Sequence, residues 1–283
     1  MEMSLSSRGL KMIAQRFGLV LGAVLAVSVL EIEGQDYCDK DLCRPGKTHI
    51  GCNNPDELSS NCVEGKQVEF DDKLKQLVLD THNNYRNMVA KGELPWLNKA
   101  ATLGVMEWDD DLAYLARLHA NRCSKGHDEC RNTKKYPSAG QNLAMRGTSS
   151  DQEPDYTVEI PKHIELWWNE KDAVTQDQID SYYSKSGTGH FTLIARDKAN
   201  RIGCAMVWYK DGSWYRTRMT CDYSYTNMIG TPGYTSGEPC SGCKSGCDTK
   251  WDGLCTKDEP YEYSISSTSS RSKKKSSVKR TKP

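Results

Sequence analysis

Cysteine is the residue type in this chain with the widest choice of chemistry, because a thiol can attack a substrate, hold a metal ion or form a disulfide. The chain has twelve cysteines in 283 residues, and none of them lies before residue 38. An even number of cysteines is typical of a disulfide framework formed in an oxidising compartment. If all twelve are paired, no thiolate remains to act as a nucleophile.

The N-terminal segment indicates export from the cell. Three basic residues, Arg8, Lys11 and Arg16, precede or border a nearly unbroken apolar stretch over 17–30. This arrangement predicts a signal peptide over 1–34 and therefore a secreted, extracellular protein, with an uncleaved signal anchor as the alternative. No later segment is apolar enough to cross a bilayer, so we expect no membrane span in the mature protein.

Charge is balanced over the whole chain and uneven only near its C-terminal end. Lysine plus arginine and aspartate plus glutamate both number 38, so we expect no nucleic-acid partner. Residues 259–283 are rich in serine and lysine, and the seven basic residues from Arg271 onward are accompanied by no acid. This composition predicts a disordered tail, which is either merely solvated or attaches to a polyanion such as a glycosaminoglycan.

Hydrophobic periodicity predicts a mixed α+β domain that begins with helices. Apolar residues recur at helical spacing over 71–90, 109–122 and 159–174, which predicts three helices. An aspartate can cap the first helix, and Gly92 can end it. We expect Pro161 in the first turn of the third helix, where a missing N–H group costs little.

The pattern then changes to a period of two and predicts a β-hairpin. Its strands cover 201–210 and 213–224, and one cysteine lies in each of them, Cys204 and Cys221. The midpoint between these cysteines falls just after Gly212, and Gly-Ser suits a two-residue turn. The turn chemistry and a bridge between the two cysteines therefore predict the same hairpin.

Two cysteine-rich segments flank this region. Residues 35–66 contain four cysteines among glycine, proline and asparagine without a convincing period, which predicts a loop-rich arm held by crosslinks. Residues 239–255 contain four more. Four cysteines this close could bind zinc, but two disulfides are the better interpretation in an exported chain.

Four short segments, in this order and at this spacing, resemble the CAP superfamily of cysteine-rich secretory proteins, antigen 5 allergens and pathogenesis-related 1 proteins. The segments are HNNYR at His82–Arg86, GHDECR at Gly126–Arg131, GQNLA at Gly140–Ala144 and GTGHFT at Gly187–Thr192. Thr220–Tyr223 is similar to the family's C-terminal signature, and the N-terminal arm is similar to insect antigen 5 proteins. The resemblance implies a three-layer α-β-α sandwich over 67–230, followed by a hinge-like cysteine segment over 231–258.

The resemblance also implies a disulfide pairing, which the number of cysteines leaves open. The implied pairs are Cys38 with Cys52, Cys43 with Cys130, Cys62 with Cys123, Cys204 with Cys221, Cys240 with Cys247 and Cys243 with Cys255.

A candidate metal site in a central cleft is a further implication of the resemblance. Motif matching assigns His127, His190 and Glu170 as ligands, and it places Gln141 in the cleft where many relatives have glutamate. Two imidazoles and a carboxylate suit zinc. Because Gln141 is neutral, we expect weakly bound, reversible zinc and no required cofactor. The alternative is that both histidines are partly buried and hydrogen-bonded within the fold.

Three functions are compatible with these features. The first is a secreted non-enzymatic binding protein of the antigen 5 type, with a small molecule, a lipid, a metal or a protein as its extracellular ligand. The second is a secreted zinc-dependent hydrolase with Glu170 as the base, which the loss of a second acid at Gln141 disfavours. The third is an ion-channel ligand, which is disfavoured because that role relies on a further six-cysteine module and no cysteine follows Cys255.

Overall fold

The computed structural model describes residues 35–263, so the predicted signal peptide lies outside the described residues. The helices are α1 (Asp72–Lys91), α2 (Asp110–Ala120), α3 (Tyr156–Trp168), α4 (Gln176–Asp180) and α5 (Gly189–Ile194), with 3-10 helices η1 (Lys40–Leu42) and η2 (Asn169–Ala173). The strands are β1 (Val63–Gln67), β2 (Glu107–Trp108), β3 (Gly140–Thr148), β4 (Arg201–Asp211) and β5 (Trp214–Tyr223). In this part of the chain no helix is both long and apolar enough to cross a membrane.

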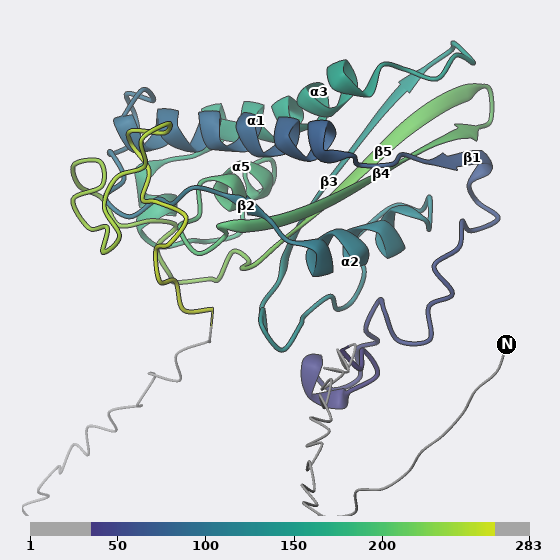
Figure 1. Ribbon diagram of the computed structural model, residues 1–283, viewed down its shortest axis with the longest axis horizontal. Coiled ribbons are helices and arrows are strands. Elements are labelled where there is room, and N and C mark those ends of the chain that lie inside the picture. Colours follow the sequence, from purple (N-terminus) through teal and green to yellow (C-terminus); the bar gives the residue numbers. More distant parts are fainter. Residues whose placement is uncertain (1–34, 264–283) are drawn as a thin grey trace, which may run out of the picture. The chain divides into compact units, whose positions relative to one another are not determined.

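The strands form one sheet between two helical layers. Their order is β1-β4-β5-β3 with antiparallel neighbours, and β2 pairs in parallel with β4. Helices α1 and α3 lie on one side of the sheet, and α2 lies on the other (Figure 1). One core cluster, which includes Val78, Trp167 and Met219, packs under α1 and α3. A second, which includes Ala116 and Val207, packs under α2. The predicted α+β fold and its three-layer α-β-α sandwich are confirmed.

The predicted helix boundaries hold best where a cap is readable in the sequence. The Asp71 side chain accepts the N–H of Leu74 at the start of α1, and Gly92 ends the helix with a φ of 75°. Helix α3 begins three residues earlier than predicted, after the Asp155 cap. Pro161 therefore lies inside the helix, and the expectation of a first-turn proline was wrong. The apolar stripe starts only at Ile160, so it gives no sign of the polar first turn.

The predicted hairpin is formed by β4 and β5. Cys204 lies directly opposite Cys221 in the register, and Gly212 in the turn has a φ of 64°. Strand β3, which pairs with β5 over its whole length, was not predicted from periodicity. The residues of its first half are largely buried whichever face of the sheet they are on, so this half lacks the alternation that marks a half-buried strand.

A buried arginine of α1 binds the C-terminal end of α5 by hydrogen bonds. The Arg86 side chain is fully buried, and its Nε donates to the carbonyl of Gly104 at 2.9 Å. Its Nη1 donates to the carbonyls of Ile194 at 2.8 Å and Arg196 at 2.7 Å. These carbonyls belong to the C-terminal end of α5 and the residues after it, where a positive charge also suits the helix dipole.

Two neighbouring residues of α1 form hydrogen bonds to other elements, His82 to strand β5 and Asn83 to the segment before β2. The His82 imidazole contacts the carbonyl of Val78 at 2.8 Å and the hydroxyl of Tyr223 at 2.9 Å. Burial lowers the pKa of His82 to about 4, so it stays neutral at physiological pH. The Asn83 amide bonds to both the N–H and the carbonyl of Met106.

All twelve cysteines are in disulfides, and no free cysteine is found in the range 35–263 that contains them. The pairs are Cys38–Cys52, Cys43–Cys130, Cys62–Cys123, Cys204–Cys221, Cys240–Cys247 and Cys243–Cys255. This is the pairing that the resemblance implied.

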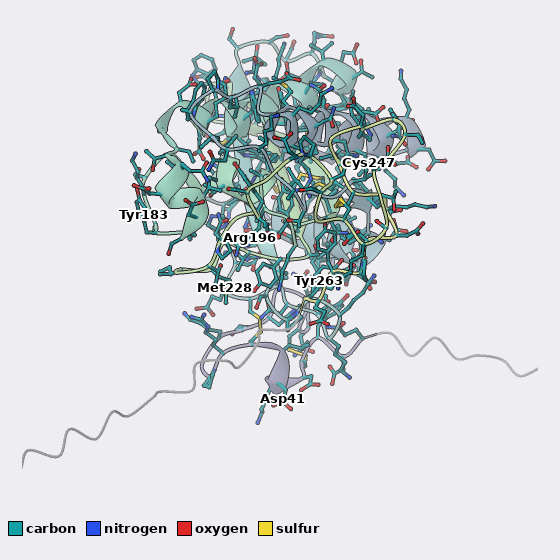
Figure 2. All side chains as sticks on the ribbon, turned by 90° about the vertical axis from the view of Figure 1, so that its left-hand side faces the viewer. Asp41, Tyr183, Arg196, Met228, Cys247 and Tyr263 are labelled. Atoms are coloured by element: carbon teal, nitrogen blue, oxygen red, sulfur yellow. A yellow bond between two sulfur atoms is a disulfide. The ribbon has the colours of Figure 1, made fainter. Side chains whose placement is uncertain are left out.

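The C-terminal cysteine-rich segment packs against the rest of the domain. Cys255 is buried, and its N–H donates to the carbonyl of Leu103 at 2.9 Å. Farther along, the ring of Tyr263 packs edge-on against Tyr136 at a centroid distance of 4.9 Å; Figure 2 shows the side chains of this end. The disordered tail expected over 259–283 is therefore wrong in its first five residues, which are described and contain packed tyrosines. The rest of the tail lies outside the described residues.

The contact between β4 and α2 requires glycine at position 203. A Cβ atom on Gly203 would lie 1.9 Å from the backbone nitrogen of Ala113 and 2.5 Å from its Cα. Both are backbone atoms, so the helix itself would have to move. Gly203→Ala should lower the free energy of unfolding by about 3 kcal/mol, measured by guanidinium unfolding of the oxidised protein.

Gly233→Ala is the matched control for this prediction. The nearest atom to a Cβ on Gly233 is 3.7 Å away, so its loss should stay below about 1 kcal/mol. Equal losses in the two variants would contradict the close-packing argument.

Candidate functional site

The four residues of the candidate site come from four separate parts of the chain. His127 lies in the loop between α2 and β3, Gln141 at the start of β3, Glu170 in η2 and His190 in the first turn of α5. The side-chain amide of Asn142 donates to the carbonyl of His190 at 3.2 Å, which holds α5 beside the start of β3.

Glu170 positions His190. Its Oε1 accepts from Nδ1 of His190 at 2.8 Å, and its Oε2 accepts the backbone N–H groups of His190 at 2.7 Å and Phe191 at 3.2 Å. Burial alone would raise the pKa of Glu170, but these hydrogen bonds hold it below its usual value. The carboxylate is therefore ionised and fixed against the first turn of α5.

Gln141 plays the corresponding part for His127. Its Oε1 lies 2.8 Å from Nδ1 of His127. Partial burial lowers the pKa of His127, and the charge of Arg131 lowers it further, against the hydrogen bond to Gln141 and the charge of Asp128. His127 is therefore a neutral imidazole at physiological pH.

The amide of Gln141 also separates two buried carboxyl groups. Its Nε2 donates to Oδ2 of Asp128 at 2.8 Å and to Oδ1 of Asp222 at 2.9 Å. The Arg131 guanidinium pairs with Asp128 at 2.8 Å. Because both N–H groups of the amide are used in this way, its oxygen must face His127. The orientation of the amide is therefore set by its neighbours.

The two aspartates differ in their affinity for a proton. Burial raises the pKa of Asp222 well above its usual range, and the charge of Asp128 raises it further, against the charge of Arg131. Asp128 is also buried, but the charge of Arg131 and its hydrogen bond hold the pKa of Asp128 below the usual value. Asp222 is therefore the group of this pair that takes up a proton first, and Asp128 stays a carboxylate.

The histidines present one open nitrogen each. Glu170 and the fixed oxygen of Gln141 can only accept, so Nδ1 of each imidazole must carry the proton. In a neutral imidazole held in this way the lone pair is on Nε2, and neither Nε2 has a hydrogen-bond partner among residues 35–263. Histidines whose other nitrogen is held by a side-chain oxygen are common metal ligands.

Glu170 was predicted to be a metal ligand, but its contacts in the structure are hydrogen bonds to His190 and Phe191. Within the described residues, His127, His190 and Glu170 do not each bring a ligand atom within 4.8 Å of the others. The group that meets this criterion is Cys243, Cys255 and Glu259, whose two sulfurs form a disulfide. Glu170 is thus arranged as a positioning residue for His190, and the two imidazoles are the groups that could hold a metal.

Three residues of this network had no role in the sequence analysis. Asp128 and Arg131 lie in the segment that supplied His127, and Asp222 lies in the C-terminal signature. Each was part of a recognised motif, so the motifs themselves were a signal. What the sequence could not show is that Gln141 would bond to Asp128 and Asp222 together.

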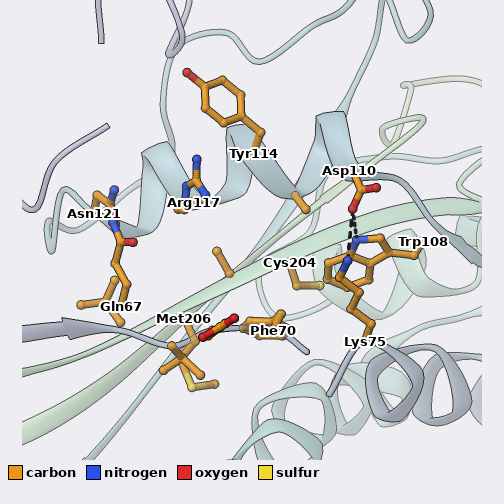
Figure 3. A pocket seen from close by; sticks show the side chains of 15 residues that line it. Gln67, Phe70, Lys75, Trp108, Asp110, Tyr114, Arg117, Asn121, Cys204 and Met206 are labelled. Carbon is orange, nitrogen blue, oxygen red and sulfur yellow. Dashed lines mark hydrogen bonds and ion pairs between the residues drawn. The ribbon is translucent and has the colours of Figure 1, made fainter. Parts of the chain in front are cut away.

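A separate cavity of about 590 Å³ lies between α2 and the strands β1 and β4 (Figure 3). Phe70 and Met206 line its apolar part. At one end the Asp110 carboxylate bonds to Lys75 at 3.3 Å and to the Trp108 indole at 3.0 Å. The volume is within the range of small-molecule sites, and the lining contains neither histidine of the cleft.

Comparison with known proteins identifies the family. The model of the cysteine-rich secretory protein family, CAP, matches residues 79–223. Venom allergen-1 of Aedes aegypti is 38% identical over 231 residues, which cover 78% of this chain and 87% of the relative. Antigen 5 like allergen Cul n 1 of Culicoides nubeculosus is 36% identical over 193 residues, covering 64% and 86%. The crystal structure of Na-ASP-1 aligns with a TM-score of 0.54 at 28% identity, covering 70% of this chain and 50% of that one.

The chain therefore belongs to the cysteine-rich secretory protein family, and its resemblance to venom allergen and antigen 5 proteins is confirmed. Relatives of this kind and six disulfides fit an extracellular protein.

Replacing Gln141 by glutamate tests the amide network. Gln141→Glu removes two N–H donors and places a third carboxyl group beside Asp128 and Asp222. The free energy of unfolding should fall by about 2–4 kcal/mol at pH 7.5. Repulsion raises the pKa of the new carboxyl group in the folded state, so the loss should shrink as the pH falls toward its unfolded value.

The measurement is denaturant unfolding at several pH values, with Gln76→Glu on the exposed face of α1 as the control. A Gln141→Glu loss that does not depend on pH would contradict the charge argument.

Proposed function

We propose that this protein is a secreted, non-enzymatic binding protein of the antigen 5 type, with an extracellular small molecule, lipid or protein as its ligand. We further propose that its cleft holds a divalent metal, zinc foremost, through Nε2 of His127 and Nε2 of His190. The observation that carries the metal proposal is that both imidazoles are held at Nδ1 by side-chain oxygens. This leaves two lone pairs and no competing partner for them within residues 35–263.

The same geometry argues for weak, reversible binding. Catalytic zinc sites use three protein ligands and structural sites use four, whereas this cleft offers two neutral nitrogens. The nearby carboxylates are already engaged, since Asp128 pairs with Arg131 and both oxygens of Glu170 accept hydrogen bonds from His190 and Phe191. Water would have to complete the coordination shell.

The position of Glu170 also argues against a hydrolase. A general base must accept a proton from the attacking water, and a carboxylate with a lowered pKa is a weak base. Both oxygens of Glu170 are engaged in hydrogen bonds. Gln141 cannot replace it, because an amide does not accept a proton at neutral pH.

Isothermal titration calorimetry with zinc after dialysis against a chelator tests the metal site. His127→Ala and His190→Ala should each weaken binding by about tenfold or more, and the double variant should show no specific binding. Glu170→Gln should weaken binding about tenfold by releasing His190. The matched control Glu165→Gln, at an exposed position of α3, should leave binding unchanged.

Hydrolysis is tested separately with the zinc-treated protein on mixed peptide and ester substrates. We expect no turnover above that of His190→Ala. Turnover that depends on His190 would overturn the non-enzymatic proposal while leaving the metal site intact. Zinc affinity that survives in the double histidine variant would overturn the metal site.

A further inference from the structure

Strand β5 buries an arginine that has no partner. The Arg218 side chain is 4% exposed, and its Nε and Nη2 are buried without a hydrogen bond. Among residues 35–263 no ion pair or hydrogen bond involves its guanidinium group. Because neighbouring Met219 belongs to the core under α1 and α3, Arg218 points to the opposite, α2 side of the sheet.

Within the described part of the chain the structure buries two other arginines, and both have partners. Arg196 donates from Nη2 to the hydroxyl of Thr231. Arg86 donates to three backbone carbonyls, which is how a folded chain usually makes a buried cation tolerable. Burial lowers the pKa of Arg218, against an opposing effect of the Tyr209 phenol, and the charge of Arg122 also lowers it. No ion pair within residues 35–263 compensates the charge of Arg218.

Arg218 lines a small cavity at the surface of the domain. The cavity has a volume of about 240 Å³, and the exposed Lys125 and Asn61 contribute to its lining. One carboxylate, Asp211, also lines it, but this group pairs with Arg216 at 3.3 Å. The lining thus combines two cations with one acid that already has a partner.

We propose that this cavity binds a tetrahedral oxyanion, a sulfate or phosphate group, either free or as the ester of a small polar molecule. The guanidinium fork of Arg218 matches two oxygens of such a group, and Lys125 supplies a second charge at the rim. A phosphate or sulfate group is small enough for the cavity.

The anion site is separate from the histidine cleft. In the sheet register Arg218 lies opposite Met145, and Asp222 lies opposite Gln141. The two positions are four residues apart along both strands, which corresponds to about 13 Å. An anion at Arg218 therefore does not require a metal at the histidines, and the two proposals fail independently.

Calorimetry and thermal unfolding of the full-length secreted protein test this site, with inorganic phosphate as the probe at constant ionic strength in chloride. Arg218→Met removes the charge and keeps the apolar stem. It should weaken phosphate binding by about tenfold or more, and in chloride alone it should unfold at the same or a higher temperature because an unpaired buried charge is gone.

Arg146→Gln is the control. Arg146 follows Met145 on β3, so its side chain faces the opposite side of the sheet, and its partner Glu159 keeps a second cation in Lys162. This variant should bind phosphate within about twofold of wild type. Both variants keep the basic C-terminal tail, so binding by the tail cancels in the comparison.

A second arm replaces phosphate by N-acetylglucosamine 6-sulfate. Tighter binding of the sulfated sugar assigns the site to sulfated glycans, and equal binding assigns it to free anions. Undiminished binding of both probes in Arg218→Met, or no saturable binding of either to wild type, overturns the proposal.

Crystals of wild-type protein soaked in tungstate decide the location without any variant. An anomalous peak within hydrogen-bond distance of Arg218 supports the site, and tungstate bound only elsewhere overturns it.

Discussion

The buried guanidinium group of Arg86 is the contact on which the geometry of the cleft depends. Helix α5 is only six residues long, and a helix this short is not stable alone in water. Its last turn is held by Arg86 through the carbonyls of Ile194 and Arg196. Its first turn is held by the Glu170 carboxylate. His190 is therefore fixed from both ends of the helix that carries it.

The other histidine depends on covalent bonds. His127 lies in a loop without helix or strand, between Cys123 and Cys130, and each of these cysteines is joined to the N-terminal arm. The sequence separations are 61 and 87 residues, for which the chain-entropy model gives about 4–5 kcal/mol per bridge. The arm contributes no residue to the cleft, yet its two bridges fix both sides of the loop that carries His127.

Much of the fold could be predicted because its signals are local. Periodicity predicted the three longest helices and the hairpin, and an aspartate cap and the glycine at 92 predicted the ends of α1. The short helices α4 and α5 were not predicted. Strand β3 could not be found in this way, because burial on both faces removes its alternation. The packing of the segment that ends at Tyr263 could not be predicted either. Its two tyrosines lie in a polar segment, and the surface against which they are buried exists only in the folded domain.

The hydrogen bonds among the candidate site residues could not be predicted from the sequence. Motif matching named His127, His190, Glu170 and Gln141, but the part played by Glu170 depends on where η2 ends relative to α5. That relation involves two segments twenty residues apart and leaves no local pattern. A weaker signal existed for the burial of Arg218. It precedes the core residue Met219, and it lies opposite the buried Val207 of β4. Because side chains alternate between the faces of a strand, Arg218 faces α2.

An amide at position 141 is consistent with the way in which the other buried charges of this domain are compensated. Arg86 donates to backbone carbonyls, Asp128 pairs with Arg131, and burial raises the pKa of Asp222 well above its usual range. A glutamate at 141 would bring a third acid to a place where Asp128 and Asp222 already share the cation Arg131. Glutamine instead donates to both aspartates and still offers an oxygen to His127. Glutamine at position 141 therefore lowers the negative charge of the cleft and at the same time stabilises the network that orients His127. The weak metal binding that we propose and the stability of the cleft would then have the same cause.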